Sequence, residues 1–193
     1  TSPFYSEHRG KNIGDFPIID KNVIRENYNT ILSDEYIGKD LHQMSTSGST
    51  GTPLTISQNR NKRNRVLAEL IYFGEKCGYN VGERNVFFRT WTEENRKHPL
   101  VAFAQNQVLI DNSCLDDEHL ESIRQTLKKD GGIKCILGYA SSLDILARYL
   151  LEKGETPDSF SLQVIISAAE ALSEVARLNL KKVFGCKVVS RYS

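Results

Sequence analysis

A short stretch rich in hydroxyl side chains and glycine is the part of the sequence best suited to chemistry. Residues 46–53 read Thr-Ser-Gly-Ser-Thr-Gly-Thr-Pro. Gly48 and Gly51 allow backbone angles that other residues avoid, so successive N–H groups can turn toward one point. Hydroxyl donors gathered there, with no carboxylate among them, suit a polyanion such as a phosphate chain. A polar hairpin turn is the alternative interpretation, because serine, threonine and glycine also cluster in ordinary turns.

This stretch differs from the P-loop of the nucleotide hydrolases. A P-loop has a longer spacing between its glycines and ends in Gly-Lys-Ser or Gly-Lys-Thr. Here two residues separate Gly48 from Gly51, and no lysine follows.

Four basic residues follow at the start of a helix that we expect over residues 58–78. Val66, Leu70 and Phe73 recur there at helical spacing. Cations at a helix amino terminus oppose its dipole by roughly a few tenths of a kcal/mol each. Either a bound phosphate or acidic surface offsets them, or they form a solvated basic face. A nucleic-acid surface is less well supported, since no aromatic residues interleave the cluster. The basic residues are Arg60, Lys62, Arg63 and Arg65.

The rest of the chain alternates strand and helix patterns. After a polar amino-terminal arm (1–40), in which Asp20 starts a short helix, the patterns repeat from residue 85 onward. Such units predict an α/β fold, a largely parallel sheet with flanking helices. The expected strands are 85–91, 107–110, 133–137, 162–167 and 187–191, and the expected helices are 116–129, 142–153 and 173–184.

Ligands of such sheets bind beyond the carboxyl ends of the strands. A glycine, aromatic rings, hydroxyls and one carboxylate should gather there. The carboxylate of Glu170 either serves a ligand or only favours a helix dipole. Tyr139 and Tyr192 either stack on a ligand or pack. The segments at this edge are 91–92, 138–141, 168–171 and 192–193.

Composition excludes several classes of protein. The 193 residues carry 25 basic and 24 acidic side chains, a net charge of +1, which argues against a dedicated nucleic-acid binder. No apolar run approaches the ~18 residues of a membrane helix, and residues 1–14 lack a signal-peptide core. We therefore expect a cytoplasmic protein with neither nucleic acid nor membrane as a partner. The four cysteines lack a C-x-x-C spacing, and the four histidines form no close metal-binding pair.

Three segments, in order, resemble motifs of the adenylate-forming enzymes. They are the loop at 46–53, Ala169-Glu170-Ala171 after an apolar strand, and Tyr192-Ser193 after residues 185–189. The pattern is similar to that of phenylacetate–coenzyme A ligases and related proteins of capsular polysaccharide biosynthesis. The resemblance spans most of residues 40–193. It implies that residues 41–193 are an incomplete ATP-binding domain, part of the large amino-terminal domain of such an enzyme.

The resemblance also implies roles for individual residues. The ATP phosphates would lie on Ser47, Gly48, Ser49, Thr50, Gly51 and Thr52. Adenine would contact Ala169, Glu170, Ala171 and Tyr192, and the acyl pocket would include Tyr139 and Ala140. Thr52 stands where many relatives have lysine, and Ala171 stands where they have proline. The family's metal-binding glutamate and catalytic lysine would lie beyond Ser193, so the catalytic residues are unknown and no metal ligand is expected within this sequence.

The implied activity is ATP-dependent conversion of a carboxylic acid to an acyl-adenylate, followed by transfer to coenzyme A or another nucleophile. ATP, Mg²⁺ and coenzyme A are the implied cofactors and co-substrate, and a small carboxylic acid is the implied partner. The 193 residues alone are expected to be inactive. The oligomeric state is open, with a homodimer as one option. The alternatives are a non-catalytic nucleotide- or acyl-binding module on this scaffold, and an unrelated α/β protein.

Overall fold

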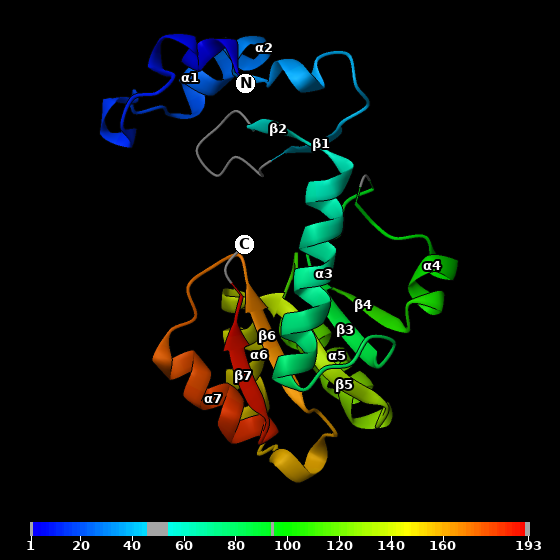
Figure 1. Ribbon diagram of the computed structural model, residues 1–193. Coiled ribbons are helices and arrows are strands. Elements are labelled where there is room, and N and C mark those ends of the chain that lie inside the picture. Colours follow the sequence, from blue (N-terminus) through cyan, green and yellow to red (C-terminus); the bar gives the residue numbers. More distant parts are fainter. Residues whose placement is uncertain (1, 46–53, 94, 192–193) are drawn as a thin grey trace. The chain divides into compact units, whose positions relative to one another are not determined.

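The computed structural model describes residues 2–45, 54–93 and 95–191. The chain divides into two compact units, Thr1–Glu69 and Leu70–Ser193. Figure 1 shows the elements of both units.

The first unit combines short helices with one hairpin. The 3-10 helices are Pro3–His8, Ile13–Asp15 and Asp34–Tyr36, and the α-helices are α1 (Lys21–Glu26) and α2 (Tyr28–Ile31). Asp20 starts α1 as expected, because its carboxylate accepts the backbone N–H groups of Asn22 and Val23 at 2.9 Å.

The hairpin brackets the glycine-rich stretch. Its antiparallel strands are β1 (His42–Ser45) and β2 (Thr55–Gln58). They pair from His42 with Gln58, at the base, to Ser45 with Thr55. The residues between Ser45 and Thr55 include the whole of the predicted phosphate loop, so the loop is the connection of this hairpin.

Helix α3 (Arg60–Cys77) runs from the first unit into the second. A helix forms where the periodicity predicted one, but most of its apolar side chains are exposed to solvent. Leu70 is 40% exposed and Phe73 is 62% exposed, whereas Gly74 is the buried residue of the helix. Periodicity therefore predicted the conformation without predicting what covers the apolar face.

A five-stranded parallel sheet forms the second unit. Its strands are β3 (Arg84–Arg89), β4 (Gln107–Asp111), β5 (Ile133–Tyr139), β6 (Val164–Ala168) and β7 (Lys187–Ser190). They lie in the order β4-β3-β5-β6-β7 (Figure 1). The predicted α/β class with a parallel sheet and flanking helices is confirmed, and each strand agrees with its predicted range to within two residues.

Four helices accompany the sheet: α4 (Pro99–Ala104), α5 (Asp117–Lys129), α6 (Ala140–Glu152) and α7 (Glu174–Phe184). The carboxylate of Asp116 and the hydroxyl of Ser173 cap α5 and α7. Gly185 ends α7 in the left-handed region, with φ of 62°. Helix α4 was not expected, because six residues are too few to show a helical period.

The core lies on one face of the sheet. Alternate strand residues, such as Val86, Phe88 and Ile165, pack there against α5, α6 and α7. The leucine and isoleucine residues that recur at helical spacing along α5 and α6 are buried: Leu120, Ile123, Leu127, Leu143, Leu146 and Leu150. On the other face a row of apolar side chains lies in register and is only half-buried: Phe87, Leu137, Ile166 and Val189.

Within the described ranges, no helix is both long enough and apolar enough to cross a membrane.

Candidate active site at the carboxyl edge of the sheet

The segment predicted to line adenine and the segment predicted to line the acyl pocket meet at the carboxyl ends of neighbouring strands. Strands β5 and β6 pair in parallel up to Tyr139 and Ala168. Just beyond, the Glu170 carboxylate accepts the backbone N–H of Ser141 at 2.9 Å. The segment expected to line adenine is therefore hydrogen-bonded to the segment expected to line the acyl pocket.

The Glu170 contact also has a local role. Ser141 lies in the first turn of α6, where backbone N–H groups have no partner within the helix. A carboxylate there satisfies one donor and favours the helix dipole. Glu170 thus favours a helix dipole, as one of its two sequence interpretations predicted. The helix is α6, which begins 30 residues before Glu170 in the chain, and not the helix that follows Glu170.

Ala169 adopts a backbone conformation that is rare for a residue with a side chain. Its φ is 69°, in the left-handed region. Such a conformation costs roughly 1–2 kcal/mol for a non-glycine residue and is often found at functional sites. It turns the chain sharply after β6 and leaves Ala169, Glu170 and Ala171 exposed.

The two predicted acyl-pocket residues differ in exposure. Tyr139 is half-buried, whereas Ala140 is only 4% exposed and belongs to the first turn of α6. Gly138 precedes them where β5 approaches β3 closely, since a Cβ on Gly138 would lie 3.2 Å from the Phe88 carbonyl oxygen. A side chain at position 138 would press on β3, so the glycine favours this close approach.

A chain of side-chain hydrogen bonds joins three more elements along the same edge. Thr90, after β3, donates to the Asn112 side-chain oxygen at 2.8 Å, and the Asn112 amide donates to Ser142 Oγ at 2.6 Å. The Trp91 indole N–H donates to the Ile110 carbonyl at 3.0 Å. These contacts hold the ends of β3, β4 and the start of α6 together.

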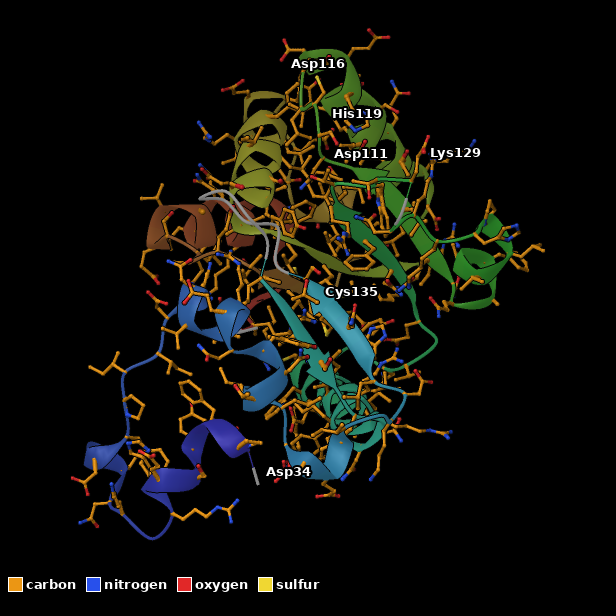
Figure 2. The ribbon with its side chains drawn as sticks, turned by 90° about the horizontal axis from the view of Figure 1, so that it is seen from above. Asp34, Asp111, Asp116, His119, Lys129 and Cys135 are labelled. Atoms are coloured by element: carbon orange, nitrogen blue, oxygen red, sulfur yellow. The ribbon has the colours of Figure 1, made fainter. Side chains whose placement is uncertain are left out.

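Asp111 organises the turn that leaves β4. Burial of its carboxyl group acts to raise its pKa, but hydrogen bonds from the Ser113 hydroxyl and from backbone N–H groups, including that of Trp91, outweigh this and lower the pKa. The His119 ring lies against the Asp111 carbonyl at 2.7 Å, and Figure 2 shows Asp111, Asp116 and His119 where β4 leads into α5. The ionised Asp111 carboxylate is therefore held by several hydrogen bonds, which fixes the turn after β4.

Arg191 brings a half-buried cation to the end of β7. Its backbone N–H donates to the Ser167 carbonyl at 2.7 Å, and burial lowers the pKa of its guanidinium. Its Nε has no hydrogen-bond partner among the described residues. The next residue is Tyr192, the predicted adenine neighbour.

Sequence reasoning did not select Asp111, Asn112 or Arg191 as site residues. The sequence held the information needed to select them, because Asp111 and Asn112 directly follow the predicted strand 107–110 and Arg191 ends the predicted strand 187–191. Applying the carboxyl-edge rule to every strand would have found all three.

Several predicted site residues fall outside the described ranges. The whole of the loop at 46–53, with Ser47, Gly48, Ser49, Thr50, Gly51 and Thr52, lies there, as does Tyr192. Their roles stay predictions. Among the residues that the structure does describe, no group of three or more His, Cys, Asp or Glu side chains could hold a metal ion.

Comparison with solved structures defines the class of fold. Over 100% of this chain and 44% of that one, it matches 2-hydroxyisobutyryl-CoA ligase in the postadenylation state in complex with 2-HIB-AMP, with a TM-score of 0.65 and 16% identity. It also matches MatB from Rhodopseudomonas palustris over 78% of this chain and 28% of that one, with a TM-score of 0.52 and 15% identity. The chain thus has the fold of part of the adenylate-forming ligases.

In sequence, the chain is similar to protein CapK of Staphylococcus aureus. The two are 28% identical over 208 residues, which cover 100% of this chain and 45% of CapK. The chain therefore spans about half the length of the curated relative it matches. No family model matches it. The predicted resemblance is therefore confirmed at two levels: the chain is similar to CapK in sequence and to acyl-CoA ligases in fold.

Proposed function

We propose that the parent protein activates a carboxylic acid with ATP and passes the acyl group from the acyl-adenylate to coenzyme A or another nucleophile. The resemblance to capsule-related proteins and the similarity to CapK support a role in capsular polysaccharide biosynthesis. Solved structures of the same fold that contain an acyl-AMP and coenzyme A support the reaction class.

The observation that carries the proposal is the hydrogen bond between Glu170 and Ser141. It joins the adenine-like and acyl-like segments at one edge of a parallel sheet. An enzyme of this class must hold the adenosine of ATP and the acid side by side, because the acid attacks the α-phosphate. The position of the two segments on adjacent strands supports this proposal.

The proposed chemistry requires no covalent nucleophile from the protein. A carboxylate oxygen of the acid bonds to the α-phosphorus, and pyrophosphate leaves with the electron pair of the broken P–O bond. The loop at 46–53 would donate N–H and hydroxyl groups to the leaving phosphates, where charge develops. Ala169–Ala171 and Tyr192 would line adenine, and Tyr139 and Ala140 would line the acid.

Mg²⁺ is not assigned to residues of this chain. Magnesium prefers carboxylates together with substrate phosphates, and the described residues offer no cluster of carboxylates to hold it.

Exchange of labelled pyrophosphate into ATP by the full-length protein, in the presence of its acid, tests the proposal. We expect Gly48→Val to abolish exchange, because a β-branched side chain is excluded from the backbone angles that glycine supplies. Gly14→Val is the matched control, since a Cβ at Gly14 meets no atom within 4 Å.

Unchanged exchange in Gly48→Val would remove the loop from the mechanism. ATP binding without any exchange, across a panel of carboxylic acids, would instead support the non-catalytic binding module.

A further inference from the structure

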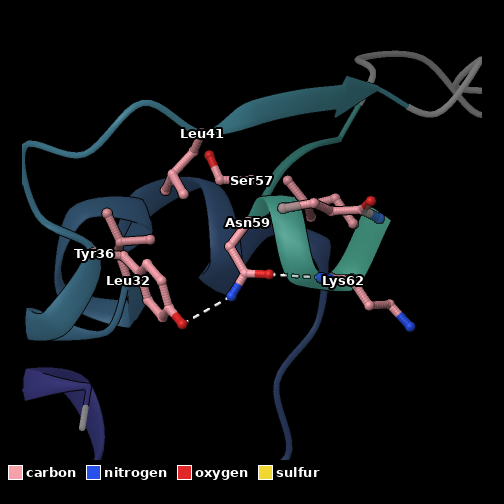
Figure 3. A pocket seen from close by; sticks show the side chains of 8 residues that line it. Leu32, Tyr36, Leu41, Ser57, Asn59 and Lys62 are labelled. Atoms are coloured by element: carbon pink, nitrogen blue, oxygen red, sulfur yellow. Dashed lines mark hydrogen bonds between the residues drawn. The ribbon is translucent and has the colours of Figure 1, made fainter. Parts of the chain in front are cut away.

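Two adjoining cavities lie at the base of the β1–β2 hairpin, within the first unit. The first, of about 320 Å³, is shown in Figure 3, and the second is about 770 Å³. Both volumes fall in the range of roughly 300–1,000 Å³ typical of small-molecule sites. Leu41 and Gln58 line both cavities, so the two share a wall and are called the paired cavity below.

The smaller cavity is apolar with a polar rim. Leu32, Leu41 and Ile56 supply the apolar wall. At the rim, the Asn59 amide donates to the Tyr36 hydroxyl at 2.8 Å, and Asn59 Oδ1 accepts the backbone N–H of Lys62 at 2.7 Å (Figure 3). This rim is therefore preorganised, and the cavity suits the ring of an organic ligand.

The larger cavity is basic. Arg60 and Arg63 line it from the first turn of α3, with Asp40 as the one acidic side chain. Neutral hydrogen-bonding groups complete the lining, among them Gln43, Gln58 and Asn64. Guanidinium groups bind phosphate oxygens through paired N–H donors, so this half suits a phosphate or diphosphate.

The cations of the two cavities lack acidic partners. Arg60, Lys62 and Arg63 make no ion pair with any described residue. They also lie at a helix amino terminus, where each one opposes the dipole. Among the described lining residues, three cations against one carboxylate give a net charge of +2. A bound anion would offset both effects.

We propose that this paired cavity binds the nucleoside diphosphate portion of the acceptor that takes the acyl group. The phosphates lie against Arg60 and Arg63, and the nucleoside enters the apolar half. The inference rests on the proposed function, because it names the acceptor of that reaction. The variant Gly48→Val, described below, tests whether this site is separate from the predicted ATP loop.

Calorimetric titration of the 193-residue chain tests the site, with adenosine 3′,5′-bisphosphate and uridine diphosphate as probes. We expect Arg60→Gln with Arg63→Gln to weaken the tighter probe about tenfold or more, because two charge-assisted contacts are lost. Arg65→Gln is the matched control, an exposed arginine of the same helix that lines neither cavity. Gly48→Val should bind the probe normally, which separates this site from the ATP loop.

The two probes identify the source of the phosphates. Tighter binding of the adenosine bisphosphate indicates a coenzyme A-type acceptor, and tighter binding of uridine diphosphate indicates a nucleotide-linked one. Binding of neither probe, or equal weakening by Arg65→Gln, overturns the proposal and leaves a solvated basic face.

A full-length version of the double variant separates the two proposals. Pyrophosphate exchange should be unchanged while the KM for the acceptor rises about tenfold. Loss of exchange in the double variant, with normal exchange in Arg65→Gln, would place these arginines at the ATP site and overturn the acceptor assignment. Absence of exchange in the unmodified protein would instead contradict the proposed function, while the titration would still decide whether the site binds phosphates.

Discussion

Single residues at the edge of the sheet couple stability to the candidate site. Glu170 lies in the segment proposed to line adenine and also satisfies a backbone donor of α6. Ala169 next to it holds a left-handed backbone conformation. Glu170 therefore links the geometry of the candidate site to the stability of α6.

Removing the Glu170 carboxylate should therefore destabilise the protein. We expect Glu170→Ala to lower the free energy of unfolding by about 0.5–1 kcal/mol, as loss of a helix cap does. Glu170→Gln should lose less, because its amide oxygen can still accept from Ser141. Urea denaturation measures both. Glu174→Ala is the control, because the Glu174 side chain is 81% exposed and lies 3.4 Å from Arg177. If Glu174→Ala lowers the free energy of unfolding as much as Glu170→Ala does, Glu170 does not act as a helix cap.

Glu155 should make stability depend on acid pH. Its side chain is 5% exposed and pairs with Arg124 and with Lys128, whose Nζ lies at 2.7 Å. Burial acts to raise its pKa, but the hydrogen bonds from Lys128, Ser159 and Arg124 outweigh this and lower the pKa to about 2. Because the pKa in the folded state is lower than the ordinary value of 4.5, the ionised carboxylate stabilises the folded state at pH values above 4.5. That stabilisation is lost as the pH falls toward about 2.

The measurement is the difference in unfolding free energy between wild type and Glu155→Gln across pH. We expect wild type to be the more stable at pH 7 and the difference to shrink steadily below about pH 4.5. Glu152→Gln, an exposed position at the end of α6, serves as the control. A difference independent of pH would show that the ion pairs contribute nothing to this dependence.

At the scale of elements, the ends of helices fix how each helix meets the sheet. Helix α7 ends at Gly185, where a Cβ would lie 2.7 Å from Pro157 Cβ. Helix α6 is followed by Gly154, which also has a positive φ of 72° but open space around it. The two glycines therefore form a natural pair of test positions.

Alanine at these glycines should separate backbone strain from a steric clash. Gly154→Ala should cost about 1 kcal/mol from the left-handed conformation alone. Gly185→Ala should cost at least about 1 kcal/mol more, because Pro157 must also move. Thermal or urea unfolding checks the order. Equal losses of unfolding free energy in the two variants would mean that the 3-10 helix Pro157–Ser159 moves to make room for the new Cβ without destabilising the fold.

At the scale of the whole molecule, the apolar surface is divided unevenly. One face of the parallel sheet is sealed by three helices, whereas the row on the other face and the apolar positions of α3 remain partly open. The stability of the second unit should therefore come from one side of the sheet.

Truncating one phenylalanine on each side tests this asymmetry. Phe88→Ala, at 1% exposure in the core, should cost about 3–5 kcal/mol. Phe73→Ala, at 62% exposure on α3, should cost about 0.5 kcal/mol or less. Urea denaturation of the 193-residue chain provides the comparison. A large loss at Phe73 would show that its ring is covered in solution.

The sequence by itself determined the parallel α/β sheet, its core positions and the resemblance to adenylate-forming proteins. Each of these depends on local periodicity or on a contiguous motif, such as the helical spacing of Leu143, Leu146 and Leu150 or the segment Ala169–Ala171. The roles of the glycine-rich loop residues and of Tyr192 stay predictions.

Only the tertiary structure decided which distant residues meet. The Glu170–Ser141 hydrogen bond, the position of Asn112 between Thr90 and Ser142, and the open face of α3 depend on how strands and helices pack. The paired cavity beside Arg60 and Arg63 likewise combines segments from before and after the hairpin. A sequence pattern states which face of an element is apolar or charged, but the partner of that face is set by contacts between residues far apart in the chain.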